Sequence, residues 1–264
     1  MGKKLNNAPV YYTVAQVQFN PVLDLDAYIP AIQAKMRERR YPDYKPEVVQ
    51  RLVLPFGGGE PGQVAAPTVT PQSRYQFGDI LGNTRFVLET NALSFQTTAY
   101  ETFEAFSEAL LAGLGVVHDA LRLDFIERIG LRYLDAIRPS GEKESLRDFL
   151  VQEVLGLSLR GEVQHQHSVS ETVVATPAGQ LVSRVVIRHG QVGLPLELTA
   201  LAPKIDPRFT QWAGLHAIID TDASTTQRQA FDLGNVETQL KALHDEIDKC
   251  FKAIVTEHAL ATWA

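Results

Sequence analysis

The sequence predicts an α+β fold in which helices pack on one face of a curved antiparallel sheet. The first observation is a repeated order of elements. A strand-like segment at residues 10–19 leads into a helix-like segment at 25–40, and the same order returns with segments 125–138 and 145–155. The second observation is that each copy closes with a long amphipathic helix, whose apolar face must be buried against another layer. An antiparallel sheet offers one such face and leaves the other face free.

The repeat divides the chain into two related halves, residues 1–123 and 124–264. Each half reads as β-α-β-β(-β)-α. The two pseudo-repeats are expected to share one sheet and to form one continuous compact unit. The length of 264 residues and the hydrophobic content of 45% are sufficient for a core of that size.

The first half is expected to contain a strand at 10–19, a helix at 25–40, a strand at 48–56, a loop at 57–71, a hairpin with strands at 74–80 and 84–98, and a helix at 100–121. Apolar and polar residues alternate imperfectly in the strands. Gly82-Asn83 marks the hairpin turn because both residues accept a positive φ. The last helix has an apolar stripe at steps of three and four, made of Phe103, Phe106, Leu110, Leu114, Val117 and Leu121.

The second half is expected to contain a strand at 125–138, a helix at 145–155, a hairpin with strands at 157–175 and 180–189, an edge strand at 193–202, a loop at 201–211, a strand at 212–222 and a helix at 235–258. Ser145 and Asp148 have the spacing of a capping box at a helix start. Pro195 interrupts the weakest strand, which favours an edge position for it. Asn235 is a suitable N-cap for the last helix.

The charge balance argues against a sequence-independent nucleic-acid binder. Lys and Arg number 25 against 31 Asp and Glu, a net charge of −6, whereas binding to phosphates draws on a basic surplus. The expected partners are therefore another protein, an identical subunit or a small molecule, and a local basic face keeps nucleic acid open as an alternative.

The sequence favours a cytoplasmic location. Its single cysteine, Cys250, excludes an intramolecular disulfide. The N-terminal segment lacks the apolar region of a secretory signal. No segment approaches the roughly 18 consecutive apolar residues that a membrane span needs. No cofactor and no membrane association are expected.

Three stretches carry a resemblance to a known family. They are the opening Leu5-Asn-Asn-Ala-Pro-Val10 before a strand, the aromatic stretch from Phe95 to Phe106, and the central Arg128-Ile-Gly-Leu-Arg-Tyr133. The chain resembles, over essentially its whole length, an uncharacterised and sporadically distributed bacterial protein family with a central Arg-x-Gly-Leu-Arg-Tyr motif. The resemblance implies no particular activity. The patchy distribution of that family is typical of horizontally moved genes, so the resemblance implies an association with a bacterial defence or toxin-linked system.

Arginines gather on one face of the long strand at 125–138. Period-two alternation places Arg128, Arg132 and Arg138 on the face opposite its main apolar set. Arg184 and Arg188 in the following hairpin extend this arginine-lined face. Guanidinium groups bind carboxylates and phosphates bidentately, so these arginines are candidates to contact a partner or a nucleic acid. The alternative is ordinary cross-strand ion pairing with Glu89 or other acids.

Two histidines share a strand face in the expected hairpin. His165 and His167 at this spacing can both bind zinc or copper, but such a site needs further ligands. His216 and Asp220 in the last strand are candidates to supply them. The alternative is a solvated sheet face without a metal.

These observations lead to three function hypotheses. The first is a non-enzymatic protein-interaction component that presents its sheet face or an edge to a partner. The second is a nucleic-acid-binding module that uses the arginine-lined face. The third is a metalloprotein that uses the His and Asp residues. No nucleophile motif stands out, and Cys250 falls beside an apolar helix stripe, where packing is its expected role.

Overall fold

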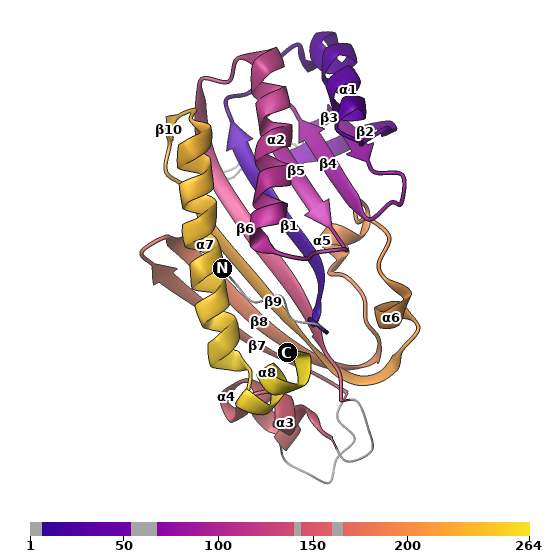
Figure 1. The fold of residues 1–264 in the computed structure, drawn as a ribbon, viewed down its shortest axis with the longest axis vertical. Helices are drawn as coiled ribbons and strands as arrows, with labels where there is room; N and C mark the ends of the chain where they lie inside the picture. The colour runs from indigo at the N-terminus through magenta and orange to yellow at the C-terminus, as the bar shows by residue number, and fades with distance from the viewer. Residues whose placement is uncertain (1–6, 54–67, 140–143, 160–165) are drawn as a thin grey trace, which may run out of the picture.

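The computed structural model describes residues 7–53, 68–139, 144–159 and 166–264. The predicted α+β class is confirmed, because these residues form one large antiparallel sheet of ten strands with helices packed against it (Figure 1). The strands are β1 (Val10–Phe19), β2 (Asp43–Val53), β3 (Thr68–Gly78), β4 (Thr84–Glu89), β5 (Ala92–Thr97), β6 (Phe125–Ile137), β7 (His167–Thr176), β8 (Gly179–Gln191), β9 (Ala213–Thr225) and β10 (Gln229–Ala230).

The helices are α1 (Ile29–Glu38), α2 (Phe103–Leu121), α3 (Leu146–Phe149), α4 (Gln152–Leu155), α5 (Leu196–Thr199), α6 (Pro207–Thr210), α7 (Leu233–Ile254) and α8 (Glu257–Trp263), with 3-10 turns at η1 (Leu25–Tyr28) and η2 (Gly156–Leu159). Among these helices, none is long and apolar enough to cross a membrane.

The strand order is β2-β3-β4-β5-β1-β6-β9-β8-β7, and β10 pairs with the start of β6. The first strands of the two expected halves, β1 and β6, lie side by side in the middle and pair antiparallel over most of their length. The sheet therefore runs without a break across the boundary between residues 123 and 124. Its edges are β2 at one end and β7 at the other.

The long helices α2 and α7 lie on the same face of this sheet (Figure 1). Their apolar stripes pack on alternate residues of the central strands and form the main core with α1. A smaller apolar cluster surrounds Phe149 and Trp263, where α3, α4 and α8 pack on the ends of β6, β8 and β9. Gly113 allows close packing of α2, since a Cβ there would lie 2.3 Å from the ring of Phe86 on β4.

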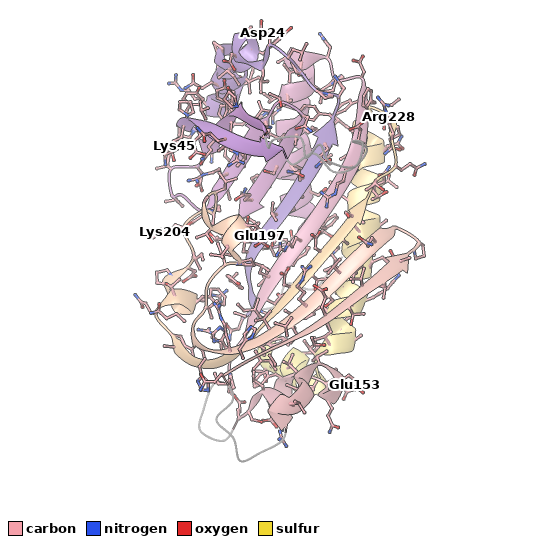
Figure 2. The ribbon with its side chains drawn as sticks, turned by 180° about the vertical axis from the view of Figure 1, so that it is seen from behind. Asp24, Lys45, Glu153, Glu197, Lys204 and Arg228 are labelled. Carbon is pink, nitrogen blue, oxygen red and sulfur yellow. The ribbon has the colours of Figure 1, made fainter. Side chains whose placement is uncertain are left out.

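The sequence predicts that the opposite face of the sheet is free, but in the structure this face is partly covered. Residues 192–212, here named the strap, leave β8, cross this face and return to β9. The strap carries α5 and α6. Its apolar residues Val192 and Phe209 are buried against the sheet, where they cover Tyr11, Tyr12, Leu134, Ala136 and Ile218. In Figure 2, which shows this face, Glu197 of the strap lies over the strands near the middle.

Hydrogen bonds hold the strap to residues of the first half of the chain. The Tyr11 hydroxyl donates to the Gly193 carbonyl at 2.8 Å. Thr98 donates to the Lys204 carbonyl at 2.6 Å, and the amide of Lys204 donates to the Gly82 carbonyl at 2.7 Å. The predicted edge strand at 193–202 was therefore wrong. Its apolar residues cover the sheet and do not extend it.

Other predicted elements also differ from the structure. The strand predicted at 84–98 was wrong, because this segment forms two strands, β4 and β5, that pair with each other. The capping box of Ser145 and Asp148 forms, but the helix that it starts ends at Phe149 and a second short helix follows, so a single helix at 145–155 was wrong. The last helix begins at Leu233 with Asp232 as its N-cap, whose carboxylate accepts the amide of Asn235 at 2.7 Å. The prediction of Asn235 as the N-cap was therefore wrong, because Asp232, three positions earlier, caps the helix.

Candidate functional site

Arg132 of the predicted arginine face forms an ion pair within the sheet. Its Nε and Nη2 atoms each donate to an oxygen of Asp220 on β9, both at 2.7 Å. Nη2 also donates to Glu197 of the strap at 3.0 Å. The exposed fractions of the Arg132 and Asp220 side chains are 13% and 5%. Burial lowers the pKa of Arg132, but the two carboxylates outweigh it and raise the pKa above its ordinary value.

Arg184 on β8 extends this pairing toward the edge of the sheet. It donates to Glu171 on β7, and its Nη1 lies 3.9 Å from Oδ2 of Asp220. Glu171, Arg184, Asp220 and Arg132 therefore form a row of alternating charges across β7, β8, β9 and β6, here named the charge row. This arrangement is the cross-strand pairing that the sequence offered as the alternative to ligand contact.

The sequence suggested Glu89 as a pairing partner for these arginines, but Glu89 pairs elsewhere. Glu89 on β4 pairs with Arg74 on β3 at 2.8 Å, far along the sheet from Arg132. Arg128 lies on the same face of β6, and its guanidinium occupies the space over Gly130, where a Cβ would lie 2.8 Å from Nη1. Burial raises the pKa of the neighbouring Asp222, against the opposing charges of Arg128 and Arg132.

The other two arginines lie at the opposite end of this face. The guanidinium of Arg138 lies over the rings of Phe209 and Trp212, at 5.1 and 5.8 Å from their centroids. Arg188 places its Nε 3.5 Å from Nε2 of His216. The five arginines therefore form two groups. Arg128, Arg132 and Arg184 surround Asp220 and Asp222, whereas Arg138 and Arg188 lie near His216.

The candidate metal ligands are also separated where the structure describes them. His165 lies outside the described residues. His167 is exposed on the edge strand β7. His216 is buried with Nδ1 3.1 Å from the Gly214 carbonyl, and Asp220 is bound to Arg132 through both oxygens. Within the described ranges, no group of three or more His, Cys, Asp or Glu side chains has a geometry that could hold a metal ion.

The environment of His216 disfavours protonation of its ring. Burial lowers its pKa, the Gly214 carbonyl opposes this shift, and the charges of Arg188 and Arg138 add to the lowering. Cys250 on α7 behaves similarly, because burial raises the pKa of its thiol and so reduces its reactivity at neutral pH. Neither group has the features of an activated catalytic residue.

A row of buried hydroxyl groups crosses the helix-covered face. Its members are aligned in register on β5, β1, β6, β9 and β8: Thr97, Thr13, Tyr133, Thr221 and Ser183. This hydroxyl row lies between the main core and the smaller cluster. The hydroxyls of Thr13 and Thr221 have no hydrogen-bond partner among the described residues.

Asp135 and two aromatic groups lie beside the hydroxyl row. The hydroxyl of Tyr133 is 3.2 Å from that of Tyr100 and 3.3 Å from Nδ1 of His244 on α7. Burial alone raises the pKa of Asp135 to about 7. The sequence contained one signal for this site, because alternation places Asp135 among the apolar residues of β6. The positions of Tyr100, which precedes α2, and of His244 on α7 could not be inferred from the pattern.

The edge strand β7 is exposed on both faces. Val169 and Val173 on the face of the charge row are 51% and 53% exposed, and Val174 on the opposite face is 41% exposed. Helix α7 packs on β6, β9 and β8, and the β7–β8 hairpin extends past it on the left of Figure 1. The sequence pattern predicts a strand in this region, but it does not show which strand lies at the uncovered edge, because strand order is not visible in the pattern.

Two surface depressions of the described residues lie away from these groups. One of about 500 Å³ is lined mainly by loop residues near Asp24 and Asp26. Asp26 there already accepts a hydrogen bond from Tyr75. Another of about 380 Å³ lies where the β7–β8 turn at Gly179 meets the end of β9 at Ser224. Neither contains a charged constellation suited to catalysis.

Comparison with known proteins leaves the site to be judged on its own geometry. No protein-family model matches the sequence, and no curated protein matches it either.

Proposed function

We propose that this protein acts by binding another protein chain, without catalysing a reaction, and that it does so along the free edge of β7. The single observation that carries this proposal is the exposure of Val169, Val173 and Val174 on both faces of that strand. An edge strand presents a row of unpaired backbone N–H and C=O groups, which a second strand can satisfy by extending the sheet. Apolar side chains on both faces then supply contact area on either side of the added strand.

The charge row supports this proposal over a polar ligand. Arg132 and Arg184 already bind carboxylates, so an incoming phosphate or carboxylate would have to displace Asp220 or Glu171. Displacing Asp220 would leave its carboxylate buried without its bidentate partner, which costs free energy. A strand that pairs with β7 needs no such displacement.

The experiment is affinity purification of the tagged chain from its host with a matched pair of variants. Val173→Glu places a charge on the β7 edge, and Val48→Glu places one on the other edge strand, where Val48 is also exposed. A stoichiometric protein that is lost with Val173→Glu and retained with Val48→Glu supports the proposal. A chain that binds no protein, or binds one equally in both variants, overturns it.

Two further parts of the proposal rest on the sequence. The association with a bacterial defence or toxin-linked system rests on the family resemblance alone, and a cytoplasmic location rests on cysteine usage. The relation of residues 1–123 and 124–264 as two pseudo-repeats is supported by the central pairing of β1 with β6 and by the similar placement of α2 and α7. Superposition of the two halves tests that relation.

The two alternative functions stay as predictions, without a specific observation that favours either. Binding of nucleic acid through Arg128 and its neighbours predicts affinity for oligonucleotides that strengthens as salt is lowered. A metalloprotein predicts stoichiometric zinc, copper or iron in protein purified without a His tag.

A further inference from the structure

The two edges of the sheet are built differently. The edge strand β2 contains Pro46, which cannot donate to a neighbouring strand, and an exposed Lys45 that pairs with Asp43 at 3.1 Å. Proline and lysine on an edge are the usual means of preventing pairing with another chain. The edge strand β7 has the sequence His-Ser-Val-Ser-Glu-Thr-Val-Val-Ala-Thr, with no proline and no lysine. Among the described residues, the same sheet thus has one protected edge and one edge, β7, on which no further strand pairs.

The exposed surface of β7 has little charge that would select a charged partner. Its only carboxylate, Glu171, is held by Arg184 of the adjacent strand. Half of its residues are β-branched, which favours pairing in a pleated sheet. A β-branched strand whose single carboxylate is already paired is a suitable neighbour for another strand of the same kind.

Geometry restricts how two copies of β7 can pair about a two-fold axis. Outward-pointing backbone groups occur on every second residue, so the numbers of two opposed residues must add to an even sum. Two registers then align nine residues of the strand. One of them places Glu171 opposite Glu171 of the second copy, where like charges destabilise the pair. The other places Thr172 opposite Thr172.

The register centred on Thr172 matches like with like at three of its five distinct pairs, the exceptions being Ser170 with Val174 and Glu171 with Val173. It pairs Ser168 with Thr176, which are both hydroxyl residues, and Val169 with Ala175, which are both apolar. Cross-strand hydroxyl pairs and apolar pairs each stabilise a sheet. It leaves Glu171 opposite Val173, so that the carboxylate keeps its own bond to Arg184.

We propose that the strand bound at the β7 edge is β7 of a second copy of this chain, paired antiparallel about Thr172, so that two sheets join into one. This inference rests on the proposed function, because it names the partner of the same edge. The interface is isologous, since each copy contributes the same residues.

The first test measures the mass of the purified full-length chain by light scattering from low to high micromolar concentration. The wild type is expected to be a concentration-dependent dimer. Val173→Glu opposes a new carboxylate to Glu171 of the second copy at two symmetric positions, and it is expected to be a monomer with an unchanged circular dichroism spectrum. Val48→Glu, the matched change on β2, is expected to remain dimeric.

The second test establishes the register by disulfide formation in a Cys250→Ala background. Two Thr172→Cys residues would lie directly opposite, with Cβ atoms about 5 Å apart, and are expected to cross-link under mild oxidation. Two Val169→Cys residues would be separated by about six residue spacings, or about 20 Å, and are expected not to cross-link. Val48→Cys on β2 is the control for random collision.

The inference of a second copy is overturned if the wild type stays monomeric at every concentration. It is also overturned if the Val173→Glu variant remains dimeric, or if the Thr172→Cys variant does not cross-link. The proposed function survives these outcomes if another protein is still lost from the Val173→Glu pull-down. It fails together with the inference only if neither a second copy nor any other protein depends on the β7 edge.

Discussion

Replacement of Asp135 by Asn is expected to stabilise the protein at neutral and alkaline pH. Asp135 lies on the helix-covered face of β6 with an exposed fraction of 8%, and burial alone raises the pKa of its carboxyl to about 7 from an ordinary value of 3.8. The folded chain therefore holds this proton more tightly than the unfolded chain. Asn has nearly the same shape and cannot ionise, so the substitution removes the cost of a buried charge.

The sign and size follow from proton linkage. The folded pKa lies above the unfolded pKa, so stability is highest below the unfolded value and falls as pH rises toward the folded value. Each unit of pKa shift is worth about 1.4 kcal/mol, which makes the full penalty of Asp135 roughly 4 kcal/mol above pH 7. Between pH 5 and pH 8 the penalty grows by about 2–3 kcal/mol. The advantage of Asp135→Asn over the wild type should grow by the same amount.

The assay is urea denaturation of the wild type and the variant at several pH values from 5 to 8. All other titrating groups are common to both proteins, so their contributions cancel in the difference. Asp245→Asn serves as a control, because Asp245 forms an exposed ion pair with Lys241 and its replacement should change stability by less than about 1 kcal/mol. A difference between the wild type and Asp135→Asn that does not grow from pH 5 to pH 8 would refute the reasoning.

Three further predictions use matched or contrasting changes. In α2, Gly113→Ala should destabilise the protein by about 1–3 kcal/mol in thermal unfolding, because its Cβ would overlap the ring of Phe86. Gly115→Ala should stabilise it by about 0.5–1 kcal/mol, because the nearest atom to its Cβ would be 3.9 Å away. Equal effects of the two variants would contradict this packing. Asp220→Asn removes the buried partner of the charge row and should cost about 2–4 kcal/mol in urea at pH 7, and a cost below about 1 kcal/mol would show that the pair contributes little. Cys250 should react with a thiol reagent much more slowly in the folded chain than in denaturant, and equal rates would contradict its burial.

The sequence predicted the fold class because long amphipathic helices and alternating strands are local patterns. The stripe of α2 from Phe106 to Val117 and the capping box at Ser145 both appear in the structure as expected. The strap could not be predicted in the same way. Its apolar residues cover the sheet from an irregular segment, so they follow neither the two-residue period of a strand nor the three-to-four-residue period of a helix. For this reason the segment around Pro195 was predicted to be an edge strand.

The sequence could predict the strand and the face on which a candidate site residue lies, but it could not predict the partner of that residue on another strand. Alternation correctly placed Arg132 on the face opposite α7, but its bidentate partner Asp220 lies 88 residues away, and pairing across that distance depends on strand order. The open edge at β7 depends on strand order in the same way. Asp135 was visible as a carboxylate on an apolar face, yet its raised pKa depends on how completely the helices exclude water.

The strap also determines when the first strand can complete its surroundings during synthesis. Tyr11 of β1 donates its hydrogen bond to Gly193, which lies 182 residues further along the chain. At roughly 5–20 residues per second, a ribosome needs about 10–40 s to make that intervening length. Until then the apolar side of β1 under the strap remains uncovered. The order of translation thus exposes the most central strand longest, and a chaperone that binds nascent chains would find its target near Tyr11 and Tyr12.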